Sequence, residues 1–385
     1  MSDCFMNTYR RLPATFTRGE GAFLFDEAGR RFLDFTSGIA VNCLGHAYPP
    51  LVKAISEQSA RFNHVSNYFQ SDVAERFARK LVEACSGAGM KKVFLGNSGA
   101  EANEAAFKIA RKYSLKKYGP GRHMIVTLKG SFHGRTITAL SATGQDKFHE
   151  DFGPFTEGFK YTPAGDIPAL DRALDSAVAG LLIEAVQGEA GVRPLDAAYV
   201  EAAAKLCAER DILLMFDDIQ CGVGRTGSFL ACEGFGVKPD VVTLAKGLAG
   251  GLPVGAALAG EKAADTLGIG DHGSTFGGNP LAAAAGLVTL ETVSNQPFLK
   301  EIARKGEKLR GVIRSWNKPN VKDVRGKGLM IGVDIEREAW GVMEKALEKG
   351  VLLLSAGAKT LRFLPPYIIS DEEIEDGLRI LEEII

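Results

Sequence analysis

The sequence predicts an α/β fold in which a large domain with a mostly parallel sheet is joined to a smaller α+β domain. Between about residues 50 and 270, short runs that are apolar on both faces alternate with helical patterns, as is typical of a parallel sheet covered by helices on each side. After about residue 280 the pattern changes to helices with shorter strands. A chain of 385 residues, 45% of them apolar, is long enough for two or three domains.

The expected elements follow this order along the chain. Residues 1–46 are rich in glycine and aromatic residues, and the runs 23–25 and 31–35 flank the turn 26–29, which predicts a hairpin within an arm. The large domain is expected to contain strands at 92–95, 124–128, 181–183, 212–216 and 241–244. The smaller domain is expected to contain helices at 281–294, 297–316, 338–349 and 371–384, and strands at 329–335, 351–354 and 361–364. The predicted division is an arm at 1–46 that packs with the small domain, a large domain at 47–280 and a small domain at 281–385, with a crevice between the last two.

Charge, hydropathy and cysteine spacing exclude several classes of protein. Lys and Arg number 46 against 47 Asp and Glu, so the chain lacks the electrostatic footprint of a nucleic-acid or anionic-membrane binder. The longest uncharged run, 272–290, contains Gly277 and Pro280 and is not expected to span a membrane. The start, Met1–Met6, has neither the basic region nor the apolar region of an export signal, so we expect a cytoplasmic protein. The six cysteines lack CxxC spacing, which predicts mostly buried reduced thiols without a zinc site.

Polar residues follow the predicted strands at the ends where parallel sheets bind ligands. They are Ser98–Glu104 after 92–95, Glu184–Glu189 after 181–183, Asp217–Asp218 after 212–216, and Lys246 after 241–244. The segment Ser98–Ala100 leads into a helix, so its free backbone N–H groups favour a phosphate. An ordinary N-cap by Ser98 fits the same residues.

Lys246 and Asp217 together suggest a carbonyl cofactor. Lys246 is followed by the uncrowded stretch 247–251, and a desolvated lysine there can form a Schiff base. A carboxylate at a neighbouring strand end, such as Asp217, keeps a pyridine nitrogen protonated. Asp217–Asp218 could also form a metal pair or a helix cap, but no His or further carboxylate lies close in sequence, which makes a metal the weaker alternative.

Two further motifs are less specific. Phe132–Arg135 offers an aromatic face for a flat ring and a guanidinium for a carboxylate. Gly222–Gly227 matches GxGxxG but does not adjoin a strand end, so we interpret it as a loop rather than a dinucleotide fingerprint.

Taken together, these residues resemble the class III, fold-type I pyridoxal-phosphate aminotransferases along essentially the whole chain. The motifs that carry the resemblance are Arg18–Gly21, Gly38–Asn42, Leu44–His46, Asn97–Glu104, Phe132–Thr136, Glu184, Gln187–Glu189, Asp217, Gln220, Gly224–Gly227, Ala245–Gly247, Ser274–Pro280, Arg362–Phe363 and Pro365–Pro366. The resemblance implies a fold-type I fold, pyridoxal phosphate as cofactor and a homodimer with composite active sites.

The resemblance also assigns cofactor roles residue by residue. Lys246 resembles the lysine that holds pyridoxal phosphate covalently and later moves a proton, and Asp217 the partner of the pyridine nitrogen. Gln220 would bind the ring hydroxyl and Phe132 would stack on the ring. The phosphate would be held by Ser98, Gly99 and Ala100 of one subunit and by Thr275 of the neighbouring subunit.

Within the family, the chain is most similar to members that transfer the ω-amino group of N2-acetylornithine to 2-oxoglutarate. Such a ping-pong reaction passes through pyridoxamine phosphate and gives N-acetylglutamate 5-semialdehyde and glutamate for arginine synthesis. Arg135 resembles the arginine for the distal carboxylate, and Arg362 the arginine for the α-carboxylate of glutamate. Glu189 would mask Arg362 while the ω-amine is bound, because a paired arginine is a poor carboxylate site. Tyr9 and Ser274 match positions near the amino-acid end of the donor.

Several alternatives stay open at this point. Ornithine, succinylornithine and 4-aminobutyrate aminotransferases share the fold and differ in how the non-reacting end is held. A NAD-dependent oxidoreductase built on Gly222–Gly227 and a non-catalytic cofactor-binding protein are more distant alternatives. The chain departs from the family pattern at Ala185, Asp218 and Cys221, where relatives usually carry Pro, Glu and Thr.

Overall fold

The computed structural model describes residues 4–385, so the beginning of the Met1–Met6 segment lies outside the described residues. Its largest sheet has seven strands. In spatial order they are β4 (Met90–Gly96), β12 (Gly255–Gly260), β11 (Val241–Leu244), β10 (Leu213–Asp217), β7 (Val178–Ile183), β5 (Met124–Leu128) and β6 (Phe159–Thr162). All neighbouring pairs from β11 to β6 are parallel, whereas β12 is antiparallel to both of its neighbours. The mostly parallel sheet predicted from the sequence is confirmed.

Two strands of this sheet, β12 and β6, are absent from the predicted set. The β12 sequence, GAALAG, consists of small residues and one leucine, which have little preference for strands. Gly255 at its start packs directly against the Ser98 carbonyl, where a Cβ would collide. Close packing therefore selects residues that strand propensity does not identify.

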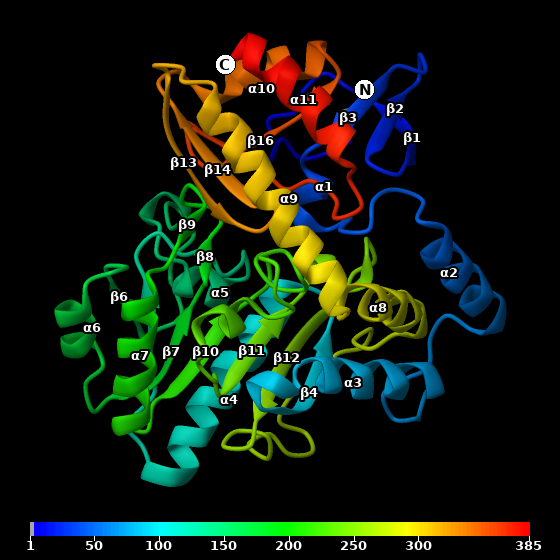
Figure 1. Cartoon of the computed structure of the whole chain (residues 1–385). Helices are drawn as coiled ribbons and strands as arrows, with labels where there is room; N and C mark the ends of the chain where they lie inside the picture. The colour runs from blue at the N-terminus through cyan, green and yellow to red at the C-terminus, as the bar shows by residue number, and fades with distance from the viewer. Residues whose placement is uncertain (1–3) are drawn as a thin grey trace.

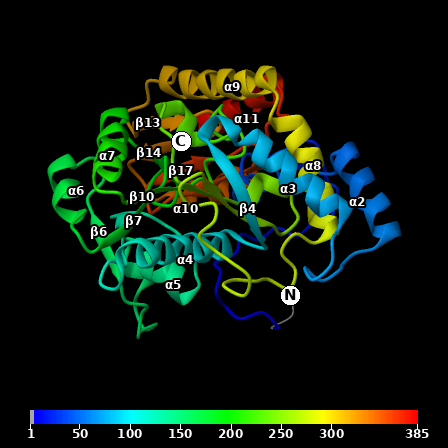
Figure 2. The same cartoon turned by 90° about the horizontal axis from the view of Figure 1, so that it is seen from below.

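Helices cover both faces of the sheet, and the strand side chains alternate between two cores. Leu213 and Met215 lie in the core beneath α4 (Gly99–Tyr118), which runs across the strands (Figure 2). Leu214 and Phe216 lie in the larger core on the opposite face, together with residues of α7 (Ala197–Glu209). Burial on both faces explains the continuous apolar runs in the sequence.

The other helical elements connect and flank the sheets (Figure 1). The α-helices are α1 (Ser37–Ala40), α2 (Pro49–Arg61), α3 (Asp72–Ala84), α5 (Ile137–Ala142), α6 (Ile167–Ala173), α8 (Pro280–Val293), α9 (Gln296–Ser315), α10 (Ala339–Glu348) and α11 (Asp371–Ile384). The short 3-10 helices are η1 (Ser86–Ala88), η2 (Asp146–Phe148), η3 (Ala231–Phe235) and η4 (Lys246–Ala249). The α8–α11 helices confirm the four helices expected after residue 280.

Two smaller sheets form the upper part of the molecule in Figure 1. One contains β1 (Phe16–Glu20), β2 (Phe23–Asp26), β3 (Arg31–Asp34) and β15 (Val351–Leu352). The other contains β13 (Val321–Lys327), β14 (Met330–Ile335), β17 (Thr360–Phe363) and β16 (Leu354–Ser355). A separate hairpin pairs β8 (Val186–Gln187) with β9 (Arg193–Pro194). The antiparallel β2–β3 pair confirms the predicted hairpin.

One predicted strand, 351–354, is wrong as a single element. The chain is divided at the buried Leu353, so that β15 pairs in parallel with β3 while β16 pairs with β17. A sequence pattern reports that a segment is apolar, but it does not report that its two halves join different sheets. The N-terminal strands thereby pack with residues from beyond 350, while the division into three domains stays a prediction.

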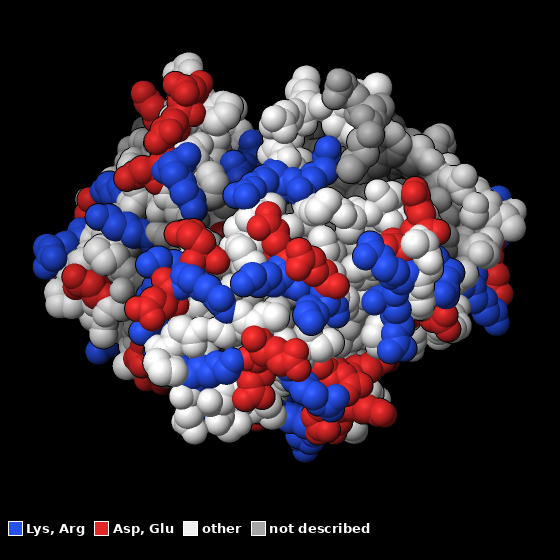
Figure 3. All heavy atoms as spheres, turned by 90° about the horizontal axis from the view of Figure 1, so that it is seen from above, with Lys and Arg blue, Asp and Glu red and all other residues white. Residues whose placement is uncertain are grey.

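The distribution of charge on the surface agrees with the nearly equal numbers of acidic and basic residues. On the face seen from above, acidic and basic side chains are interspersed (Figure 3). Within residues 4–385, no helix is long and apolar enough to cross a membrane.

Candidate active site

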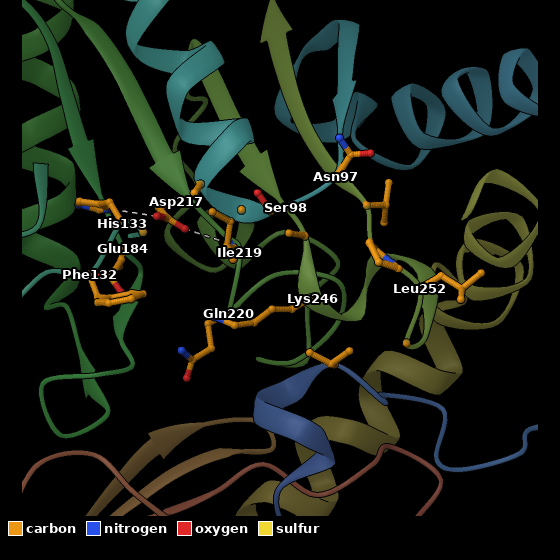
Figure 4. A pocket seen from close by; sticks show the side chains of 18 residues that line it. Asn97, Ser98, Phe132, His133, Glu184, Asp217, Ile219, Gln220, Lys246 and Leu252 are labelled. Carbon is orange, nitrogen blue, oxygen red and sulfur yellow. Dashed lines mark hydrogen bonds and ion pairs between the residues drawn. The ribbon is translucent and has the colours of Figure 1, made fainter. Parts of the chain in front are cut away.

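A cavity of about 410 Å³ lies at the carboxyl ends of the central strands, within the size range of small-molecule sites. It brings together seven of the predicted site residues: Ser98, Gly99, Ala100, Phe132, Asp217, Gln220 and Lys246. Figure 4 shows Lys246 extended across the cavity, with Phe132, Glu184 and Asp217 on the opposite side. The ends of β10 and β11 are adjacent because Asp217 and Thr243 are paired in parallel register, as the sequence predicts.

Lys246 has the surroundings of a reactive amine. It follows β11 with a left-handed φ of 44°, a strained conformation for a residue with a side chain. Burial, assisted by the charge of Arg362, lowers the pKa of Lys246 despite the opposing effect of Glu189 and Asp217. A lowered pKa increases the fraction of neutral amine, which is the nucleophilic form.

Asp217 is held by a dense set of hydrogen bonds. Its Oδ2 accepts from Asn103 Nδ2 at 2.8 Å and is 2.8 Å from His133 Nδ1, and its Oδ1 accepts from the Ile219 N–H at 3.1 Å (Figure 4). The carboxylate is 3% exposed and lines the cavity. Because a carboxylate has about four lone-pair positions, Asp217 retains capacity for a proton donor in the cavity.

The helix α4 begins at the cavity wall. Ser98 is its N-cap, and the Ser98 hydroxyl accepts from the Glu101 N–H. The N–H groups of the first turn have no intrahelical acceptor, so the helix start offers donors and a positive dipole end to an anion. The capping role and the anion-binding role considered from the sequence are therefore compatible.

A second buried carboxylate, Glu184, lies in the same cavity. Burial, together with the nearby Asp217, raises the pKa of Glu184 well above its ordinary value. One Glu184 oxygen accepts from the Phe132 N–H at 3.1 Å. Glu184 thus fixes the backbone of the loop that presents the Phe132 ring.

The Arg362 guanidinium reaches this site from the small C-terminal sheet. Arg362 on β17 is 3% exposed, and its Nη1 donates to the Glu189 carboxylate and to Gln220 Oε1 at 3.1 Å. Burial tends to raise the pKa of Glu189, but Arg362 outweighs it, so the pKa is lowered and the glutamate is held as an anion. Arg362 Nε is buried without a hydrogen-bond partner among the described residues, so the pair leaves one donor of the fork unused.

Six predicted site residues lie outside the cavity lining: Glu189 and Arg362, which contact the lining residue Gln220, and Arg135, Tyr9, Ser274 and Thr275. Arg135 is exposed, and its Cζ lies 4.1 Å from the centroid of the Phe148 ring. Tyr9 is 72% exposed. Ser274 and Thr275 line a separate hollow that also includes Asn97, and Ser274 Oγ accepts from Asn97 Nδ2 at 3.0 Å.

Sequence reasoning did not assign roles to Asn103, His133 and Glu184. All three stand inside the quoted motifs, and each is buried. A polar residue in an apolar helix or after a strand is a signal that could have singled them out, since buried polar groups require partners. Their partners come from distant segments and are not readable from the sequence.

The neighbouring Asp218 is separate from the cavity. Its Oδ2 accepts from the Ala231 N–H at 2.6 Å, and Cys221 Sγ donates to its Oδ1. Residues 4–385 contain no group of three or more His, Cys, Asp and Glu side chains arranged to hold a metal ion. The GxGxxG stretch forms turns, and its Arg225 is fully buried and donates to the Leu329 and Pro365 carbonyls, which fits a structural loop.

Residues 5–385 match the family model described as Aminotransferase class-III. The chain therefore belongs to the class III aminotransferase family, and it is an aminotransferase.

Within this family, the chain is similar to acetylornithine and ornithine aminotransferases. The chain is 47% identical to an acetylornithine aminotransferase from Caldanaerobacter subterraneus subsp. tengcongensis, over 99% of this chain and 96% of that relative. The solved N-acetylornithine aminotransferase from Stenotrophomonas maltophilia superposes with a TM-score of 0.85 at 38% identity, covering 98% of this chain and 96% of that one. An ornithine aminotransferase from Toxoplasma gondii, described with partial occupancy of PLP at its active site, superposes with a TM-score of 0.94 at 33% identity, covering 99% and 91%.

Proposed function

We propose that this aminotransferase binds pyridoxal phosphate and transfers the ω-amino group of N2-acetylornithine to 2-oxoglutarate. The observation that carries the proposal is the ion pair between Glu189 and the buried Arg362 beside the Lys246 cavity. An amine donor without a carboxylate near the reacting amine needs this arginine masked, whereas glutamate and 2-oxoglutarate need it free. Acetylornithine aminotransferases among the relatives, at 42–48% identity, support the choice of donor.

The residues present fit pyridoxal phosphate. A lysine of lowered pKa, a buried carboxylate with spare acceptor capacity and a helix start line one cavity, matching the aldehyde, the ring nitrogen and the phosphate of that cofactor. When bound, pyridoxal phosphate supplies an electron sink that stabilises negative charge on the carbon bearing the amine. Lys246 would hold the aldehyde and would carry a proton between substrate positions, and Asp217 would hold the proton of the ring nitrogen.

The remaining cofactor contacts orient the ring. Phe132 would pack against its face, Gln220 would donate to the ring hydroxyl, and the N-cap Ser98 with the first-turn N–H groups of Gly99 and Ala100 would hold the phosphate. Gln220 is also the link to the specificity pair, because its amide contacts both Glu189 and Arg362. Movement of Glu189 is thereby coupled to the ring-binding side chain.

Two arginines hold the substrates at different points. Arg135 binds the distal carboxylate, where its planar fork can make two parallel hydrogen bonds. Arg362 binds the α-carboxylate of glutamate after Glu189 turns away. Tyr9 and Ser274 complete the amino-acid end of the donor site. The products are N-acetylglutamate 5-semialdehyde and glutamate, as in arginine synthesis.

The proposed working unit is a cytoplasmic homodimer. Thr275 lies exposed outside the lining of its own chain's cavity, which supports a contact with the phosphate in a neighbouring subunit. The exposed Phe276 and Tyr68 near this loop provide apolar area for such an interface.

Absorbance spectroscopy of the purified holoenzyme tests the proposal. N2-acetylornithine should remove the visible cofactor band faster than ornithine, succinylornithine or 4-aminobutyrate at equal concentrations, and 2-oxoglutarate should restore it. Absence of a visible band even after added pyridoxal phosphate would contradict cofactor binding. A band that responds only to amines other than these four would contradict the substrate class.

Ornithine aminotransferase activity is a second candidate. The TM-score of 0.94 to the Toxoplasma enzyme exceeds the 0.85 to the Stenotrophomonas enzyme. The same titration separates the two, since a higher single-turnover rate with ornithine would favour this alternative.

A further inference from the structure

Asn103 is the buried amide that connects the elements around the cavity. It lies on α4 with 0% exposure. Its Nδ2 donates to Asp217 Oδ2 and to the His133 carbonyl, both at 2.8 Å. Its Oδ1 accepts from the Thr243 hydroxyl at 2.8 Å. Both amide hydrogens are therefore used, and the amide is held at three points.

The chemistry of these partners fixes the orientation of the amide. A carboxylate and a carbonyl are acceptors, so only the nitrogen of Asn103 can face them, while the Thr243 hydroxyl can donate to the oxygen. A flipped amide would place an oxygen against two acceptors in a buried site, at the cost of unsatisfied polar groups. The donor hydrogens consequently point at Asp217 and His133 in one arrangement only.

Each partner belongs to a segment that bears a residue of the proposed cofactor site. Asp217 ends β10, Thr243 is in β11 shortly before Lys246, and His133 follows Phe132. No other described side chain bonds to all three segments. A single helix residue thus connects the strand that ends at Asp217, the strand that precedes Lys246 and the loop that carries Phe132.

The hydrogen bond to Asp217 also stabilises charge. An N–H donor to a carboxylate favours its ionised form over the neutral acid. The Asn103 amide is neutral, so it donates to the Asp217 carboxylate without introducing a cation that would compete for it.

We propose that Asn103 is a positioning residue for catalysis that holds the Asp217 carboxylate oriented toward the pyridine nitrogen of the proposed cofactor. This inference rests on the proposed function, because it assigns Asp217 a cofactor partner. A purely structural role would instead make Asn103 a bond between helix and sheet, with effects on stability alone.

Two substitutions at this position separate the roles. Asn103→Asp replaces the donor with an oxygen against Asp217, and two carboxyl groups at this distance share a proton. Asn103→Ala removes the donors without adding charge and suits a helix. Thr243→Val is the matched control, because it breaks the third hydrogen bond of the same amide and leaves the donors to Asp217 and His133 in place.

Three measurements are made on each purified variant: thermal unfolding without cofactor, the pyridoxal phosphate dissociation constant of the apo-protein, and the pH midpoint of the visible band of the holoenzyme. For Asn103→Asp we expect about ten-fold weaker cofactor binding and an upward shift of the midpoint by about one pH unit. The shift is upward because a less negative Asp217 leaves the ring less protonated, and the proton at the lysine linkage is then lost at higher pH. Asn103→Ala should shift the dissociation constant and the midpoint in the same direction by a smaller amount.

The results distinguish a positioning role of Asn103 from a purely structural role. Thr243→Val should lose thermal stability while keeping the wild-type midpoint and dissociation constant. Wild-type midpoints in both Asn103 variants, or equal midpoint shifts in Thr243→Val and Asn103→Ala, would overturn the positioning role. If Asn103→Asp does not fold, Asn103→Ala and Thr243→Val decide alone. A wild-type holoenzyme without a visible band would instead contradict the proposed function, which keeps the two failures distinct.

Discussion

The two ends of the site, Asp217 in the cavity and the Glu189–Arg362 pair beside it, differ in how firmly their charged groups are held. At one end, Asp217 accepts three hydrogen bonds from Asn103, His133 and Ile219, with both cores of one sheet packed around it. At the other end, Arg362 lies on β17 and Glu189 lies in the turn after β8. The Glu189 side chain is 26% exposed, and Arg362 Nε has no hydrogen-bond partner among the described residues. The first arrangement is fixed by its neighbours, whereas the second has a partner that can leave.

This difference matches two chemical requirements. The group that keeps the cofactor ring protonated must stay in one place throughout both half-reactions, and preorganised polar groups do so without rearrangement. The group that selects the substrate must change state between half-reactions, since the donor and acceptor carry different charges near the reacting centre. A carboxylate at the site edge can exchange one partner for water at low cost.

Lys246, which lies between the two ends, should give the largest effect on substitution. Lys246→Ala removes the amine that we propose binds the cofactor and carries the proton, so turnover should fall by about 10⁴-fold or more. The visible absorbance of the cofactor should disappear as well. Absorbance and steady-state rates measure both, with the exposed Lys349→Ala as control. Normal turnover in Lys246→Ala would contradict the assignment.

Substitution of Asp217 at the fixed end should strongly reduce turnover. Asp217→Asn keeps the shape of the side chain but removes its charge and places an amide against the Asn103 donor, so we expect turnover to fall by about 10²–10³-fold. The reduction should affect the half-reactions with acetylornithine and glutamate alike, because both use the same protonated ring. Stopped-flow rates of the separate half-reactions test this. A loss confined to one half-reaction would mean that Asp217 discriminates between substrates.

Substitution of Glu189 at the exchangeable end should change substrate specificity more than the overall rate. Glu189→Ala frees Arg362 for an α-carboxylate, and a hydrogen-bonded charge pair contributes about 1.5–3 kcal/mol. The single-turnover rate with glutamate relative to acetylornithine should therefore rise by about ten-fold. Asp323→Asn, which breaks an exposed pair with Arg325 on the same small sheet, is the control and should leave the ratio unchanged. An unchanged ratio in Glu189→Ala would remove the switch from the mechanism.

The sequence predicted the fixed end more completely than the exchangeable end, for a physical reason. Lys246 and Asp217 directly follow apolar runs, and parallel strands bring their carboxyl ends to one edge, so their proximity follows from the pattern. Glu189, in the turn that follows β8, and Arg362, on β17, are 173 residues apart, and only the family resemblance paired them. The division of 351–354 between two sheets and the small-residue strand β12 depend on packing partners, which a local pattern does not contain.

Substitution of Asp218 should have the smallest effect on turnover. Because Asp218 is buried but does not line the cavity, its substitution distinguishes the effect of a buried carboxylate on stability from an effect on catalysis. Asp218 is adjacent to Asp217 and equally buried but faces away from the cavity. Burial raises the pKa of Asp218 to about 7, although the Ala231 N–H opposes the shift. Between about pH 4 and 7 the unfolded chain loses this proton while the folded chain keeps it, so the free energy of unfolding falls as pH rises, by up to about 4 kcal/mol in total.

Asp218→Asn removes this ionisation and should make the free energy of unfolding less dependent on pH between 4 and 7. The variant should be more stable than the wild type at pH 8, with the difference shrinking toward pH 4, while turnover stays close to the wild-type value. Denaturant unfolding of the apo-protein at pH 5 and pH 8 measures the difference, and the exposed Asp151→Asn serves as control. Equal pH dependence in wild type and Asp218→Asn would mean that the folded protein already accommodates the charge. In that case burial alone would not determine the charge of these carboxylates, and Asp217 would differ from Asp218 in its hydrogen-bond partners and its place in the cavity.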